Sequence, residues 1–130
     1  MAHAHRQLPH PEPVDAWTQA LRNLHEADVR FAPVQAAFNQ AERAWFAVKN
    51  DHATVTHPEQ QHAKACFDEA SEQERIFGNA LFEAASAVYR TPAPHLAGVI
   101  QKIEIIEMIG YDGSVEQLIL KDLRRLEQSG

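Results

Sequence analysis

Large apolar side chains recur every seven residues through the first part of the chain, at Trp17, Leu24, Phe31, Phe38 and Trp45. A small or β-branched apolar residue follows each of them three positions later, at Ala20, Ala27, Val34, Ala41 and Val48. Apolar residues spaced alternately three and four positions apart form one stripe along a helix, and that stripe packs against a neighbouring helix. The spacing therefore predicts a long helix that lies against another long helix or a second copy.

This predicted helix runs from Asp15 to about Asn50 without a glycine, and its only proline is Pro33. Asp15 is expected to cap it, because aspartate accepts hydrogen bonds from the free N–H groups of a first helical turn. Pro33 removes one backbone donor and clashes with the carbonyl four residues earlier, which costs about 3 kcal/mol. We therefore expect a kink or a short break near Val29 to Ala32.

A second long helix is predicted from Pro58 to Tyr89 or Arg90, where the prolines of the Thr-Pro-Ala-Pro segment end it. Glu74 interrupts its apolar stripe, which comprises Ala63, Phe67, Ala70, Phe77, Leu81, Ala84 and Val88. The first helix carries large aromatic residues and the second carries many alanines, so their facing ridges can interdigitate. We expect an antiparallel helical hairpin over residues 14–90.

Two shorter helices are predicted in the last third of the chain. The apolar face of the first comprises Leu96, Val99, Ile100, Ile103 and Ile106, and a turn from Gly110 to Gly113 ends it. The second begins after Ser114 and carries an apolar face of Val115, Leu118, Ile119, Leu123 and Leu126. A strand over 103–109 is the alternative, but no second strand candidate exists to pair with it. The predicted fold class is all-α, a helical bundle made of the long hairpin and this shorter pair.

The predicted organisation is a tail followed by one domain. Residues 1–13 hold three of the eight histidines and three of the seven prolines, and they offer almost nothing to bury. We expect a disordered tail there and a single helical domain over 14–130, with the hairpin at 14–90 and the C-terminal pair at 91–130. Apolar surface on such elongated helices favours a homodimer.

Composition argues against several classes of function. The net charge of −6 argues against a nucleic-acid binder, and no apolar run approaches the roughly 18 residues of a membrane span. A single cysteine, Cys66, fits a reducing compartment, so the cytoplasm is the expected location. The sequence contains neither a phosphate-binding glycine loop nor a nucleophile elbow. We therefore expect no enzymatic activity and no cofactor.

Acidic residues are concentrated on the second predicted helix. Between residues 51 and 87 there are seven acids against two basic residues, which places five of the six net negative charges there. The densest group is Asp68, Glu69, Glu72 and Glu74. Because complementary potentials steer association, these four residues are the candidate contact with a macromolecular partner. The favoured function is a non-enzymatic interaction or scaffold protein that presents this acidic helix.

Two alternatives use other residues. Glu59 and His62 have the Glu-x-x-His spacing of carboxylate-bridged metal bundles, and His57 lies next to them, which suggests a metal or ligand site. A second such motif and two further carboxylates are missing. Cys66 is expected on the apolar side of the helix, as a small buried residue. The other alternative is nucleic-acid contact through Lys121, Arg124 and Arg125 near the end of the last helix.

Three segments of the C-terminal third carry a resemblance. Residues 91–96 read Thr-Pro-Ala-Pro-His-Leu, 102–104 read Lys-Ile-Glu, and 122–126 read Asp-Leu-Arg-Arg-Leu. They resemble a pattern in small uncharacterised proteins of alphaproteobacterial chromosomes and prophages. The resemblance covers about the last 36 residues. It implies a bacterial or phage origin and no particular activity.

Overall fold

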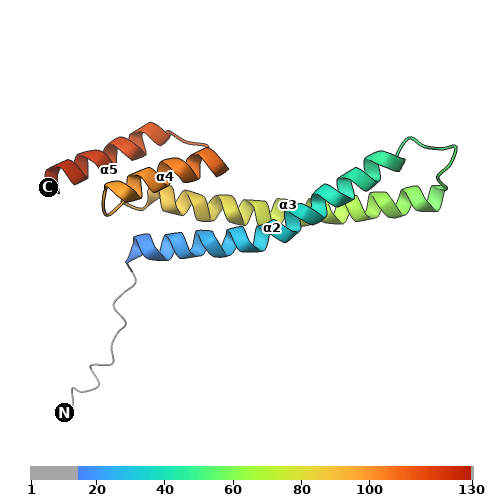
Figure 1. Cartoon of the computed structure of the whole chain (residues 1–130), viewed down its shortest axis with the longest axis horizontal. Coiled ribbons are helices and arrows are strands. Elements are labelled where there is room, and N and C mark those ends of the chain that lie inside the picture. Colours follow the sequence, from blue (N-terminus) through green and yellow to red (C-terminus); the bar gives the residue numbers. More distant parts are fainter. Residues whose placement is uncertain (1–14, 130) are drawn as a thin grey trace, which may run out of the picture. The chain divides into compact units, whose positions relative to one another are not determined.

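The computed structural model describes residues 15–129, and this part of the chain is all-α (Figure 1). Its four helices are α2 (Ala16–Val48), α3 (His57–Arg90), α4 (Leu96–Ile109) and α5 (Val115–Ser129). The long helices α2 and α3 form an antiparallel hairpin, and two shorter helices follow it. This arrangement confirms the predicted fold class, including the helix expected over residues 103–109. The predicted N-terminal tail lies outside the described residues.

Helix α2 follows the predicted range closely and spans 33 residues. The N–H of Thr18 donates to Asp15 Oδ1 at 2.8 Å, so Asp15 caps the helix as predicted. The helix then continues without interruption through Pro33, and the break expected near Val29 is absent. Pro33 and Val29 both lie on the exposed side of α2, where water can satisfy the carbonyl that has lost its donor. The break is therefore ruled out, and the alternative of a kink at Pro33 stays a prediction.

Side-chain caps hold the connection between α2 and α3. Asp51 accepts hydrogen bonds from the backbone N–H groups of Ala53 and Thr54 and from the Thr54 hydroxyl. The hydroxyl bond contributes most to lowering the pKa of Asp51 below its ordinary value. Gln60, from the first turn of α3, donates to the carbonyls of Val48 and Asp51 at 2.9 and 3.1 Å. These bonds tie the end of α2 to the start of α3.

The two predicted stripes form the contact between α2 and α3. On α2, all ten positions of the seven-residue pattern are buried or half-buried. The ring of Phe67 on α3 lies 5.8 Å from that of Phe38 and 6.0 Å from that of Phe46, measured between centroids. Aromatic pairs at such distances favour tilted arrangements, which these rings adopt. The periodicity therefore identified the facing sides of the two helices.

The chain divides into two compact units. The hairpin unit is Glu26–Leu81, and the terminal unit joins the described residues up to His25 with those from Phe82 onward. Helices α2 and α3 each pass through both units. Most of the buried apolar residues belong to the terminal unit, and they are Trp17, Ala20, Leu24, Ala85, Val88, Tyr89, Ala93 and Val99.

Helix α4 buries only part of the predicted apolar face, with Val99 buried and Ile106 half-buried. Leu96, Ile100 and Ile103 were expected in the core, yet all three are exposed. Gly98 and Lys102 are buried instead, together with Val99. A Cβ at Gly98 would approach Ala93 and Trp17 to 3.2 Å, which is tighter than an ordinary contact, so a larger residue would require these neighbours to shift. Similarly, α5 buries Asp122 and leaves Leu123 exposed, because polar pairing as well as hydrophobicity orients these helices.

Candidate functional site

The predicted acidic contact lies on α3 in the hairpin unit. Asp68, Glu69 and Glu72 are exposed, whereas Glu74 is half-buried at its position in the apolar stripe. Residues three and four positions apart share one side of a helix, so Asp68 and Glu69 both neighbour Glu72. The structure therefore brings three of the four predicted residues together. We call Asp68, Glu69 and Glu72 the acidic side of α3.

Two basic residues partly neutralise the acidic side of α3. Lys64 Nζ lies 3.0 Å from Asp68 Oδ2, and Arg75 Nη2 lies 2.5 Å from Glu72 Oε2. The hydrogen bond from Arg75, and then its positive charge, lower the pKa of Glu72 below its ordinary value. Both pairs are exposed, so each contributes little to stability. Glu69 has no cationic partner among the described residues and is left as the uncompensated charge.

A groove of about 800 Å³ runs beside the acidic side of α3, between the two helices of the hairpin unit. Most of its side chains are small, and the lining comprises Pro33, Val34, Ala37, Gln40, Ala41, Ala44, His62, Ala65, Cys66, Glu69, Ala70 and Gln73. Glu69 thus belongs to both the groove and the acidic side. The groove is therefore an apolar channel with a carboxylate at its border.

The proposed metal ligands do not converge. Glu59 accepts hydrogen bonds from the Thr56 N–H and hydroxyl, while its own N–H donates to the Thr56 hydroxyl. This reciprocal capping box starts α3, and the Thr56 hydroxyl contributes most to lowering the pKa of Glu59. His62 faces Cys66, with Nε2 3.6 Å from Sγ, and His57 is exposed. Across residues 15–129, no three histidine, cysteine, aspartate or glutamate residues are placed to hold a metal ion.

Cys66 corrects a further expectation, because it is exposed and not buried in the apolar contact. The stripe of α3 passes through Ala63, Phe67 and Ala70, which are half-buried. Cys66 is one position before Phe67, and a rotation of 100° per residue turns its side chain away from the contact and into the groove.

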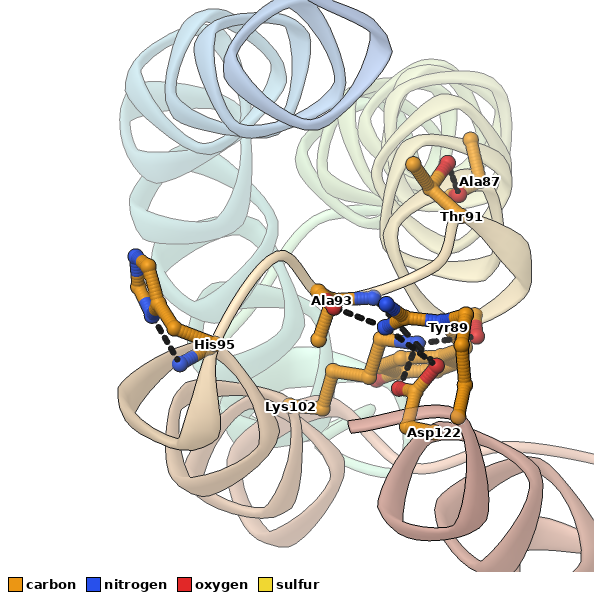
Figure 2. A network of polar contacts seen from close by, with 9 residues as sticks. Ala87, Tyr89, Thr91, Ala93, His95, Lys102 and Asp122 are labelled. Carbon is orange, nitrogen blue, oxygen red and sulfur yellow. Dashed lines mark hydrogen bonds and ion pairs between the residues drawn. The ribbon is translucent and has the colours of Figure 1, made fainter. Parts of the chain in front are cut away.

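The terminal unit contains a buried ion pair that the sequence analysis missed. Lys102 Nζ on α4 lies 2.5 Å from Asp122 Oδ2 on α5 and donates to the carbonyl of Tyr89 at 2.9 Å (Figure 2). Asp122 also accepts from the N–H of Ala93 at 3.3 Å. Only 1% of Lys102 and 4% of Asp122 is exposed. A buried charge pair of this kind needs complete hydrogen bonding, and these bonds supply it.

The basic residues of α5 have different surroundings. Arg125 donates to the carbonyl of Ala93 and lies 3.7 Å from Asp122, so it belongs to the buried network. Lys121 and Arg124 are exposed. Of the three residues predicted to contact nucleic acid, Arg125 therefore has a structural role, and Lys121 and Arg124 face solvent.

The three segments that carry the resemblance meet in this network (Figure 2). The hydroxyl of Thr91 donates to the carbonyl of Ala87 at 2.6 Å, and His95 Nδ1 accepts from the N–H of Gly98 at the start of α4. Lys102 and Asp122 come from the other two segments. A lysine on an apolar helix face and an aspartate on another were the sequence signals for this pair, since an unpaired buried charge is costly.

No helix in the described part of the chain is long and apolar enough to cross a lipid bilayer. No protein-family model, curated protein or solved structure matches the chain.

Proposed function

We propose that this chain is a non-enzymatic interaction protein whose hairpin unit binds a helix of a protein partner. The binding surface comprises the groove between α2 and α3 together with the acidic side of α3. The partner helix would place an apolar ridge in the groove and lysine or arginine residues along the side that faces Glu69.

The observation that carries this proposal is the incomplete core of the hairpin unit. Only one apolar side chain of this unit, all of which is described, is buried, that of Leu81, which lies at the end of the unit. Its other large apolar side chains are only half-buried, as for Phe31, Phe38, Trp45, Phe67 and Phe77, or more exposed, as for Val29 (57%), Phe46 (53%) and Ile76 (44%). Two helices in contact cannot enclose their apolar residues, and monomeric proteins rarely expose large contiguous apolar patches. A further helix would complete this core.

The shape of the groove supports a helix as the occupant. Ala37, Ala41 and Ala44 share one side of α2, and Ala65 and Ala70 lie across from them on α3. Small side chains allow the ridge of another helix to approach two backbones closely. The uncompensated carboxylate of Glu69 then selects a partner with positive charge at that edge.

A defined peptide tests the proposal. The probe is an amphipathic leucine-lysine helix, and its counterpart has glutamate at every lysine position. We expect the lysine peptide to bind, and the double variant Glu69→Lys with Glu72→Lys to weaken its binding by about tenfold or more, because the attraction becomes repulsion. Titration calorimetry at two salt concentrations measures the affinity and its charge dependence.

Matched controls separate the groove from general charge. Glu104→Lys with Glu107→Lys makes the same charge change on exposed positions of α4 and should leave the affinity nearly unchanged. Ala44→Trp fills the groove and should block binding, whereas Ala36→Trp, at an exposed position outside the lining, should not. Equal binding of the two peptides, or equal effects of the paired variants, would contradict the proposed surface.

A further inference from the structure

The terminal unit has a second groove, of about 680 Å³, whose chemistry differs from that of the hairpin. It is formed by the end of α3, the segment after it, Lys102 of α4 and one side of α5. Its lining comprises Tyr89, Arg90, Pro92, Lys102, Gln117, Leu118, Leu120, Lys121, Asp122, Arg124, Arg125 and Gln128. Five of these residues are basic and one is acidic, in a chain whose net charge is −6.

The single carboxylate that lines this groove already forms an ion pair within the protein. Asp122 is buried and binds Lys102 at 2.5 Å, with Arg125 at 3.7 Å. In contrast, Arg90, Lys121 and Arg124 are exposed and form no hydrogen bond or ion pair with any described residue. We call these three residues the basic rim. Positive charge is therefore concentrated here, and the lining contains no acidic side chain other than Asp122.

Helix dipoles explain only part of the basic rim. Cations are favoured in the last turn of a helix, where free carbonyls carry partial negative charge, and Arg90 occupies the last turn of α3. The last turn of α5 contains no basic residue. Lys121 and Arg124 lie earlier in α5, where the dipole has little effect, and like charges three positions apart repel each other. A bound anion from outside the described chain would offset this repulsion.

The remaining lining restricts the kind of anion. Pro92, Leu118 and Leu120 offer apolar surface next to the basic rim, and Gln117 and Gln128 offer amide groups. The volume falls within the range of small-molecule sites. Arginine matches phosphate geometry with paired N–H donors, and three cations exceed what one carboxylate would neutralise.

We propose that this groove binds a small organic phosphate. Arg90, Lys121 and Arg124 hold the phosphate oxygens, and Leu118 and Leu120 contact the apolar body of the ligand. This ligand site is independent of the hairpin surface, since every lining residue belongs to the terminal unit.

Three probes separate the parts of the site in calorimetric titrations of the full chain. ADP carries phosphate and a planar apolar body, pyrophosphate carries only the anion, and adenosine only the body. We expect ADP to bind more tightly than pyrophosphate and adenosine to bind weakly. Lys121→Ala with Arg124→Ala should weaken ADP and pyrophosphate binding by about tenfold or more and leave adenosine unchanged.

The control variant removes the same two charges elsewhere, through Arg43→Ala and Lys49→Ala in the hairpin unit, where both residues are exposed. Circular dichroism establishes that each variant remains helical. Loss of ADP binding only in the Lys121 and Arg124 variant supports the site. The proposal is overturned if ADP does not bind at millimolar concentration or if both variants lose affinity equally. Tighter binding of a twelve-residue thymidine oligonucleotide, with the same dependence on Lys121 and Arg124, overturns it in favour of nucleic-acid contact.

Discussion

At the scale of single residues, the Lys102–Asp122 pair is the most consequential feature of the terminal unit. It links α4 and α5 and, through the carbonyl of Tyr89 and the N–H of Ala93, also reaches α3 and the segment that follows it. The centroid of the Trp17 ring lies 5.7 Å from Lys102 Nζ, so the ring also contacts the ammonium group. The pair thus fixes which sides of α4 and α5 are buried.

The two partners should differ in how much their loss destabilises the protein. Asp122→Asn leaves the ammonium of Lys102 buried without an anion, and we expect a loss of about 3–5 kcal/mol in the free energy of unfolding. Lys102→Met should cost less, because Asp122 keeps the Ala93 N–H and Arg125. Urea unfolding monitored by circular dichroism measures both, with the exposed Asp112→Asn as control. A larger loss from Lys102→Met would contradict this account.

Sequence reasoning succeeded for residues with local partners and failed for those with distant ones. The cap at Asp15 requires only a backbone N–H three positions away, so its residue type and position were sufficient. Lys102 and Asp122 are 20 residues apart, and although each lies on the apolar face of its helix, neither helix alone indicates which residue its partner is. The exposure of Cys66 was missed because it depends on a shift of a single position along the helix, which turns the side chain by 100°.

At the scale of the elements, the spacing of apolar residues predicted the buried sides of the long helices better than those of the short ones. The seven-residue pattern of α2 continues over five repeats, so a single interruption such as Pro33 did not end the helix. Helix α4 spans 14 residues and is apolar on nearly every side, so its sequence does not single out one face. Close packing at Gly98 and the charge of Lys102 decide the orientation instead.

The end of α4 provides a test at this scale. Gly110 has φ of 95° and ψ of 174°, a backbone region that is essentially limited to glycine, and its N–H donates to the Ile106 carbonyl at 2.8 Å. Gly110→Ala should therefore destabilise the protein by about 1–3 kcal/mol, although nothing lies within 4 Å of the added methyl group. Thermal and urea unfolding measure the change.

Gly78 supplies a control, because its substitution by alanine should change the stability in the opposite direction. It lies inside α3, and a Cβ there would make an ordinary contact with Phe31 at 3.4 Å. Gly78→Ala should stabilise the helix by about 0.5–1 kcal/mol, because alanine is the better helix former. If the two substitutions had the same effect, backbone conformation would not be the cause at Gly110.

At the scale of the whole molecule, the two units differ in how completely they bury their apolar residues. The terminal unit has a core around Trp17, Val88 and Val99, whereas the apolar seams of the hairpin unit are half-buried except at Leu81. The sequence indicated the hairpin, but burial depends on how many helices surround each seam, and a periodic pattern does not specify that number.

Self-association is also expected, through the exposed apolar residues that lie outside the groove, and we predict a homodimer with twice the 14.6 kDa mass of the chain. Phe46→Glu with Ile76→Glu places charge on the exposed apolar residues of the hairpin unit and should yield monomers. Light scattering after size exclusion measures the mass. Ile100→Glu with Ile103→Glu, on the exposed side of α4, is the matched control. A monomeric wild-type chain, or a dimer that only the α4 variant dissociates, would contradict an interface on the hairpin.

The distribution of the two tryptophans follows the division of the chain into units. Trp17 is buried in the terminal unit, and Trp45 is half-buried in the hairpin unit. Their emission spectra therefore report on different regions, with the shorter wavelength expected from Trp17 in its apolar surroundings. Replacing either one by phenylalanine leaves a single fluorophore, so intrinsic fluorescence can reveal whether the two units lose their structure in one step or in succession.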